Sequence, residues 1–430
     1  MTHKLKRIAR IALIILGVIT LYVAWVYLQP DESLSPELQA ALSQRAKALP
    51  DVETAAVALL GLEAPESEDF MVYGRKMLAA QRAGQDWNDA ATQASNGKAG
   101  LQFKNRPEVE CWLYDKDEEI PAGIRNNCGS AELIAEYLKD NATMMSRYRI
   151  GQKMPRAAGN VQFRGQPTIL LSKMNVVEIA DDVSRGMAER AYVKWRDHYV
   201  HQKQMAGNGS GWVLTAINLV NEQLSFTGLD VLLKHAPQLA DRHRDELLAL
   251  LKPSGLARYD VPGIILGETE VVAYYLGTPS LSRWVRINRL RNRRFESASE
   301  FIHVVLQPSA DLRGKLAALR LSTKKTQGLR LADALDPTSA VVWMRIRDAD
   351  TKAAELVDAM VRSEGYLRLF TIELRLASEK ISDEKITAFL NDAAEPLRNP
   401  WDGTPATWDS HRRILSMKHP DKDSRVEVHL

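Results

Sequence analysis

The chain has 430 residues, of which 45% are apolar and 26% are charged, so its composition is that of a folded protein and not of a disordered one. Its formal net charge is +3, but residues 1–28 contribute four Lys and Arg and no Asp or Glu. The remainder holds 53 basic against 54 acidic residues. Because this balance gives no positive field, we expect no nucleic-acid partner.

The segment 11–28 contains no charged side chain, and it is followed by Asp31 and Glu32. An apolar helix of about this length crosses a bilayer core, and the excess of cations on its N-terminal side orients it. We therefore expect residues 1–10 to be cytoplasmic and residues 11–28 to be a transmembrane signal anchor. A cleaved signal peptide is the alternative, although the bulky residues of YVAWVYLQP occupy the positions where a cleavage site needs small ones.

Two cysteines, Cys111 and Cys128, are the only ones in the chain. The expected orientation places both in a compartment where disulfides form, so we predict that they are joined. In the chain-entropy model a loop of this size stabilises the fold by about 3 kcal/mol. A zinc site or a redox pair is less favoured, because neither four ligands nor C-x-x-C is present.

Helix start signals recur through the N-terminal half. Ser35 precedes Pro36 and Glu37 and predicts an N-cap, and Asp51 and Ser67 are candidate caps for two further helices. Between about 86 and 121 the helical pattern fades, which predicts irregular structure closed by the cysteine pair. A helix is predicted over 130–150.

Amphipathic patterns continue through most of the remaining chain. On the predicted helix 212–225, Val213, Ile217, Val220 and Leu224 fall on one face. Helices are expected over the following ranges: 167–184, 186–205, 212–225, 228–251, 267–276, 280–305, 310–320, 328–334, 338–347, 351–376 and 382–391. Alternating period-two segments are nearly absent before residue 399, so the sequence predicts an all-α fold.

Many short helices joined by short turns predict an irregular array that resembles an α-solenoid, although no fixed repeat period is found. We divide the extramembrane part into an N-terminal helical region with the disulfide loop (29–165), a helical array (166–398) and a C-terminal segment (399–430). The last begins with NPWDGTP, which is dense in turn formers, and continues into two β-like stretches. It predicts a small β-hairpin.

The anchor, the cysteine pair followed by a helix ending in SRYR, and the ending NPWDGTPATWD form a recognisable layout. Together they resemble signal-anchored, mostly helical periplasmic proteins of Gram-negative bacteria. The matching turn residues here are Asn399, Pro400, Trp401, Gly403 and Pro405. The resemblance implies an inner-membrane protein with a periplasmic body, and it implies no activity.

The densest charged segment is SRWVRINRLRNRR. It could bind an anionic partner, such as a lipid headgroup, a glycan or an acidic protein surface, because guanidinium groups pair with phosphate and carboxylate. A solvated or ion-paired helix face is the alternative that we favour. The candidate binding residues are Arg283, Trp284, Arg286, Arg289, Arg293 and Arg294.

Motifs of catalysis or cofactor binding are incomplete. His198 and His201 are spaced to share one helix face, but a third ligand and a general base are missing, so we interpret them as ordinary surface or interface histidines. We expect no cofactor and no resident metal. The sequence favours a binding or scaffolding role in the cell envelope, and the alternative is a glycan or peptide hydrolase that uses unidentified carboxylates.

Overall fold

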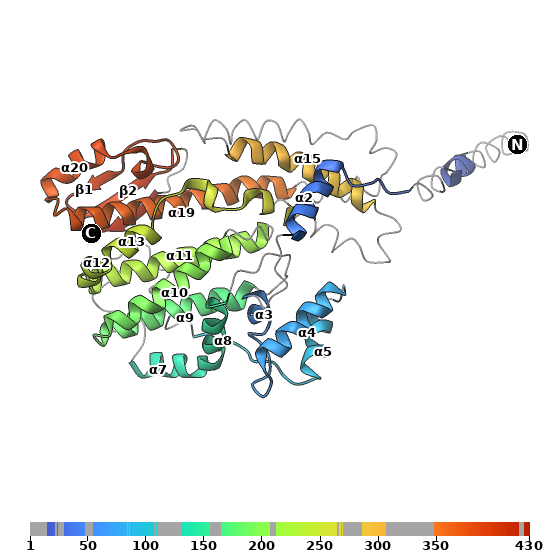
Figure 1. The fold of residues 1–430 in the computed structure, drawn as a ribbon, viewed down its shortest axis with the longest axis horizontal. Helices are drawn as coiled ribbons and strands as arrows, with labels where there is room; N and C mark the ends of the chain where they lie inside the picture. The colour runs from blue at the N-terminus through green and yellow to red at the C-terminus, as the bar shows by residue number, and fades with distance from the viewer. Residues whose placement is uncertain are drawn as a thin grey trace, which may run out of the picture.

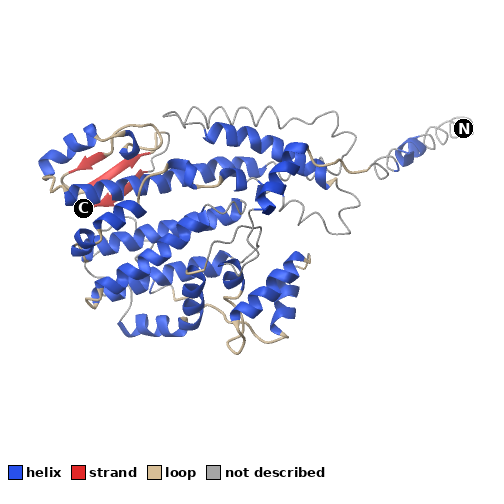
Figure 2. Cartoon of the chain, viewed as in Figure 1, coloured by secondary structure: helices blue, strands red, loops and turns tan. Residues whose placement is uncertain are grey.

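The structure is a computed structural model. It describes residues 15–21, 24, 30–47, 55–83, 85, 87–106, 109, 131–154, 165–206, 212–264, 266, 267, 269, 286–306, 348–420 and 425–430. These residues are mostly helical, with one small sheet near the C-terminus (Figures 1 and 2). The prediction of a mainly helical body is confirmed.

The elements follow one another in three groups. The first contains α2 (Pro36–Lys47), α3 (Ala55–Leu60), α4 (Phe70–Arg82), α5 (Trp87–Ser95), α7 (Ala131–Asp140) and α8 (Ala142–Gln152). The second contains α9 (Gly165–Ser184), α10 (Ala188–Ala206), α11 (Trp212–His235), α12 (Gln238–Arg242), α13 (Arg244–Leu250) and the 3-10 helix η3 (Gly255–Arg258). The third contains α15 (Ile287–Leu306), α19 (Asp348–Ser378), α20 (Asp383–Asp392), η4 (Glu395–Leu397), β1 (Thr407–Asp409), β2 (Ile414–Lys418) and β3 (Arg425–His429).

Capping side chains set the starts of α2 and α4. The Ser35 hydroxyl accepts the Leu38 N–H at 3.2 Å, as predicted. α4 begins later than expected because Asp69, and not Ser67, accepts the N–H of Met71 at 2.8 Å. The prediction of irregular structure from residue 86 was wrong for α5, which packs on α4.

Close backbone contacts join α3, α4 and α8. A Cβ on Gly74 would lie 2.0 Å from the carbonyl oxygen of Val57, so only glycine permits this approach of α4 to α3. The buried guanidinium of Arg147 in α8 donates to the carbonyls of Ala64 and Pro65 at 2.5 and 3.1 Å. The turn after α3 is thereby fixed to α8.

The helix predicted over 130–150 is divided in two at Asn141. The side-chain amide of this buried residue donates to the carbonyls of Tyr137 and Lys104 at 3.0 Å each. Its Oδ1 accepts the Lys104 N–H at 2.8 Å. Asn141 therefore binds a distant segment where a helical pattern alone predicts continuity.

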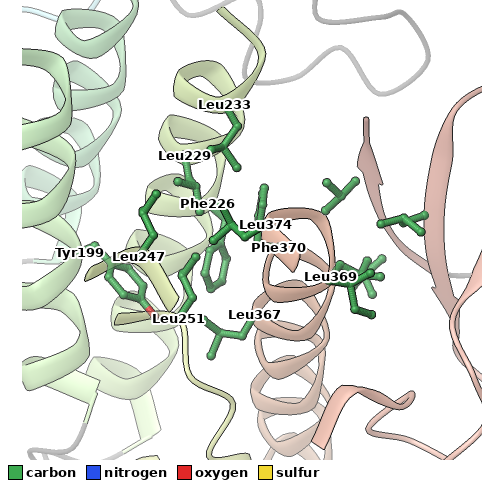
Figure 3. Close-up of a cluster of buried hydrophobic side chains, with 14 of the residues drawn as sticks. Tyr199, Phe226, Leu229, Leu233, Leu247, Leu251, Leu367, Leu369, Phe370 and Leu374 are labelled. Atoms are coloured by element: carbon green, nitrogen blue, oxygen red, sulfur yellow. The ribbon is translucent and has the colours of Figure 1, made fainter. Parts of the chain in front are cut away.

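Three long helices, α9, α10 and α11, lie side by side, and α19 packs against α11 (Figure 1). Two helices were predicted over 212–225 and 228–251, but α11 continues through the expected break, and Gly228 lies inside it. A Cβ there would come 3.1 Å from Ile179 of α9, so this glycine serves packing and does not end the helix. Figure 3 shows the core between these helices, where Phe226, Leu251 and Phe370 meet.

The C-terminal segment forms a three-stranded antiparallel sheet in the order β1-β2-β3, so one strand more than the predicted hairpin is present. The preceding turn attaches the sheet to the rest of the body. Asn399 donates to the Lys418 carbonyl at 2.9 Å, and the Trp401 indole donates to Asp358 of α19 at 3.1 Å. His419 Nε2 also lies 3.1 Å from that carboxylate.

Several predictions fall on residues outside the described ones. They are the cytoplasmic segment 1–10, most of the anchor 11–28, both cysteines with their disulfide, most of the helix predicted over 267–276, and the helices predicted over 310–320, 328–334 and 338–347. Within the described ranges, no helix combines the length and the apolar character that a membrane crossing needs. Residues 15–21 are helical and lie away from the body in Figure 1.

Candidate functional site

An apolar groove between α11 and α19 is the candidate functional site, and its volume is about 400 Å³. α11 contributes Ala216, Leu219, Val220 and Gln223, which recur at the spacing of one helix face. α19 contributes Glu355, Leu356, Ala359, Arg362, Ser363 and Tyr366. The groove is large enough for a small ligand or for several side chains of a protein partner.

The two helices run in the same direction, and they pack tightly only along part of their length. Phe226 of α11 stacks on Tyr366 and Phe370 of α19, with ring centroids 5.7 and 5.9 Å apart. Closer to the two N-termini, the small side chains of Ala216 and Ala359 take the facing positions. The aromatic contact closes one end of the space, and the alanines leave the other end open.

The rim of the groove combines an exposed apolar residue with charges of both signs. Val220 is 42% exposed. Glu355 is exposed, and the side chain of Arg362 is 41% exposed and lies 3.9 Å from Asp358. Because 3.9 Å is longer than a hydrogen bond, Arg362 is only loosely held.

The floor of the groove rests on a buried carboxylate. Ser363 lines the groove, and its hydroxyl donates to Glu222 Oε2 at 2.6 Å. The other oxygen of Glu222 accepts Nη1 of Arg258 at 2.6 Å, and the Tyr259 hydroxyl donates to Oε2 at 3.1 Å. Both charged side chains are at most 5% exposed. Glu222 is therefore a fully engaged acceptor and not a free base.

Arg258 connects this carboxylate to a second one. Its Nε lies 3.8 Å from Glu364 of α19, whose other oxygen accepts Nε of Arg368 at 3.3 Å and the Gly255 N–H at 3.0 Å. Burial lowers the pKa of Arg258, but the two carboxylates outweigh burial, and the net shift is upward. Burial also raises the pKa of Tyr259 well above its usual value. The cluster joins α11, η3 and α19 through hydrogen bonds and ion pairs.

The arginine-rich segment lies on and before α15, and its described part is less exposed than a solvated face would be. Arg293 is 9% exposed and Arg294 is 1% exposed, whereas Arg286 and Arg289 are half-buried. Arg283 and Trp284 lie outside the described residues. Binding of an anionic partner by this segment remains a prediction.

The N-terminus of α15 is held by the chain that directly follows the predicted anchor. Asp31 accepts the N–H groups of Asn288 and Arg289 at 2.8 and 3.3 Å, in the manner of an N-cap. The Ser35 N–H donates to Asn292 at 2.8 Å. Residues 258 positions apart are thus brought together.

His198 and His201 were predicted to be ordinary surface or interface histidines, and the prediction of a surface position was wrong. They are 1% and 3% exposed, and their rings meet Tyr148 of α8 with centroids 6.1 and 6.0 Å apart. Neither ring nitrogen of His198 has a hydrogen-bond partner among the described residues. In that same part of the chain, no group of three or more His, Cys, Asp or Glu side chains could hold a metal ion.

No family model, curated protein or solved structure matches the chain. The groove and the cluster beneath it are the features that sequence reasoning missed. One signal was available: polar Asn218, Asn221, Glu222 and Ser225 interrupt the apolar pattern of α11, and all four are at most 4% exposed. A run of polar residues within an apolar helix indicates a buried hydrogen-bonded cluster.

Proposed function

We propose that this chain is a single-pass inner-membrane protein of a Gram-negative envelope, whose periplasmic helical body binds a partner protein and serves as a scaffold. The observation that carries the proposal is the open apolar groove between α11 and α19. Val220 is an apolar side chain that is 42% exposed, and its burial by a partner would be favourable because it removes apolar surface from water.

The anchor part of this proposal is supported by the described residues 15–21. Their large apolar side chains are 51 to 72% exposed, which favours a lipid environment. Asp31, which caps α15, follows Leu28 by three positions, so its Cα lies within roughly 11 Å of the end of the predicted anchor. At that level Arg286 and Arg289 can approach lipid phosphates.

The scaffolding part is supported by α9, α10 and α11, each of which packs against the other two. Stacked consecutive helices present extended surfaces to partners, as in α-solenoids. The hydrolase alternative is less well supported, because acid and base catalysis needs a carboxylate that reaches the substrate. Glu222 and Glu364 are instead enclosed and paired with Arg258.

A photo-crosslinking amino acid at Val220, in the full-length chain in its native membrane, tests binding at the groove. Val193 on α10 is the matched control, because it is also a Val and is also 42% exposed. We expect a discrete protein adduct from position 220 and not from position 193. Equal adduct patterns at both positions, or none at either, would contradict partner binding at the groove.

Reporter fusions test the topology separately. Reporters placed after residue 35 and at the C-terminus are both expected to be active on the periplasmic side. Cytoplasmic activity of the C-terminal reporter would contradict the membrane orientation, whatever the result of crosslinking.

A further inference from the structure

We infer that the occupant of the groove is an amphipathic α-helix of a partner protein, with apolar residues on one face, one cation placed against Glu355 and one anion placed against Arg362. This inference rests on the proposed binding function and specifies the chemistry of the partner. It follows from the shape of the groove and the charges on its rim.

The shape fits a helix because the groove is itself the space between two parallel helices. The lining residues of α11 span positions 216 to 223, which corresponds to two helical turns and about 10.5 Å. A third helix laid along this space would insert side chains at i, i+3 or i+4, and i+7. About 400 Å³ accommodates a few aliphatic side chains of such a helix.

The charges on the rim give a spacing that a partner can match. Glu355 and Arg362 are seven residues apart on α19, so both lie on the side of the helix that borders the groove. A partner helix aligned with α19 places its own residues i and i+7 at the same separation, about 10.5 Å. Opposite charges at these two positions would pair with the rim in either chain direction.

A membrane lipid fits the same site less well. The phosphate of an anionic phospholipid would be attracted by Arg362 and repelled by Glu355, which is exposed on the same rim. An acyl chain also offers no charged group that could pair with Glu355 or Arg362. A helix that carries one cation and one anion at the edge of its apolar face can pair with both.

Three synthetic helical peptides with the same apolar face test this inference on the full-length protein in nanodiscs. They carry at positions i and i+7 one Lys and one Glu, two Lys, or two Glu. Wild-type protein is expected to bind the mixed peptide best, Arg362→Glu the two-Lys peptide, and Glu355→Lys the two-Glu peptide. Exposed charge pairs change the dissociation constant by up to about fivefold each at low salt, and added salt should reduce the difference.

Arg375→Glu is the matched control, because Arg375 is an exposed arginine of the same helix outside the groove. This variant has the same net charge as Arg362→Glu and should keep the preference for the mixed peptide. An unchanged order of affinities in Arg362→Glu would overturn the inference. So would a lipid, or a second copy of this chain, as the species crosslinked from position 220.

These outcomes separate the inference from the proposed function. A partner protein crosslinked at position 220, combined with peptide affinities that ignore the rim charges, would retain groove binding and overturn the charge-matched helix. Failure of crosslinking itself would contradict the proposed function.

Discussion

Acidification should destabilise the body through two histidines buried beside α8. Burial, with a further contribution from His201, lowers the pKa of His198 to about 3, and burial lowers that of His201 to about 4. In the unfolded chain both have a pKa of about 6.5. The two histidines therefore bind protons in the unfolded state that they do not bind in the folded state. The free energy of unfolding decreases as the pH falls below about 6.5.

The size of the effect follows from proton linkage. When the pH is lowered from 7.5 to 5, each histidine decreases the free energy of unfolding by about 2 kcal/mol. Its imidazole is then mostly protonated in the unfolded state and mostly neutral in the folded state. The pair together costs about 4 kcal/mol. If the whole body of roughly 400 residues unfolds as one unit, this lowers the melting temperature by about 5 °C.

Thermal denaturation of the wild type and of the double variant His198→Leu/His201→Leu at pH 7.5 and pH 5 isolates this contribution, since other titrating groups are common to both proteins. The facing titratable side chain, Tyr148, remains neutral because burial raises its pKa. The double variant should lose about 5 °C less than the wild type on acidification. An equal loss in both proteins would refute the argument that the histidines are buried in the neutral form.

Three other substitutions test the packing of the body. Arg258→Met leaves two buried carboxylates without their shared cation and should cost about 3–5 kcal/mol in chemical denaturation, so a loss below about 1 kcal/mol would contradict the cluster. Gly74→Ala forces a Cβ against the Val57 carbonyl and should destabilise the packing of α4 on α3 by about 2 kcal/mol. We expect faster proteolysis around α3 and α4. Unchanged cleavage would show that the two helices can separate freely. Asp31→Ala removes the cap of α15 and should cost about 1 kcal/mol, detected as about fivefold faster hydrogen exchange at the start of that helix but not in α19.

Local signals in the sequence predicted most helix positions in the described chain. Ser35 before Pro36 gave the start of α2, and the predicted range 382–391 nearly coincides with α20. These features depend on residues within one or two turns of each other. Local reasoning failed where a residue interacts with a distant segment. Asn141 separates α7 from α8 and bonds to Lys104, and Gly228 gives room for Ile179 inside a continuous helix.

The candidate groove could not be predicted, because it depends on the orientation of α11. The apolar pattern predicted a buried face through Ile217, Val220 and Leu224, yet Val220 is 42% exposed and Glu222 is 1% exposed. The helix is rotated because Glu222 pairs with Arg258 and Ser363, which are 36 and 141 residues away. A single helical period cannot identify such partners, so Val220, which lines the groove, was assigned to the core.

The central claim is that the groove between α11 and α19 binds a helix of a partner protein. The most direct measurement is competition between the Lys/Glu peptide and the partner crosslinked at Val220 in native membranes. We predict that the peptide abolishes the adduct in the wild-type background, and that up to about fivefold more peptide is needed in the Arg362→Glu background. An adduct whose yield is unchanged by saturating peptide in the wild type would contradict the claim.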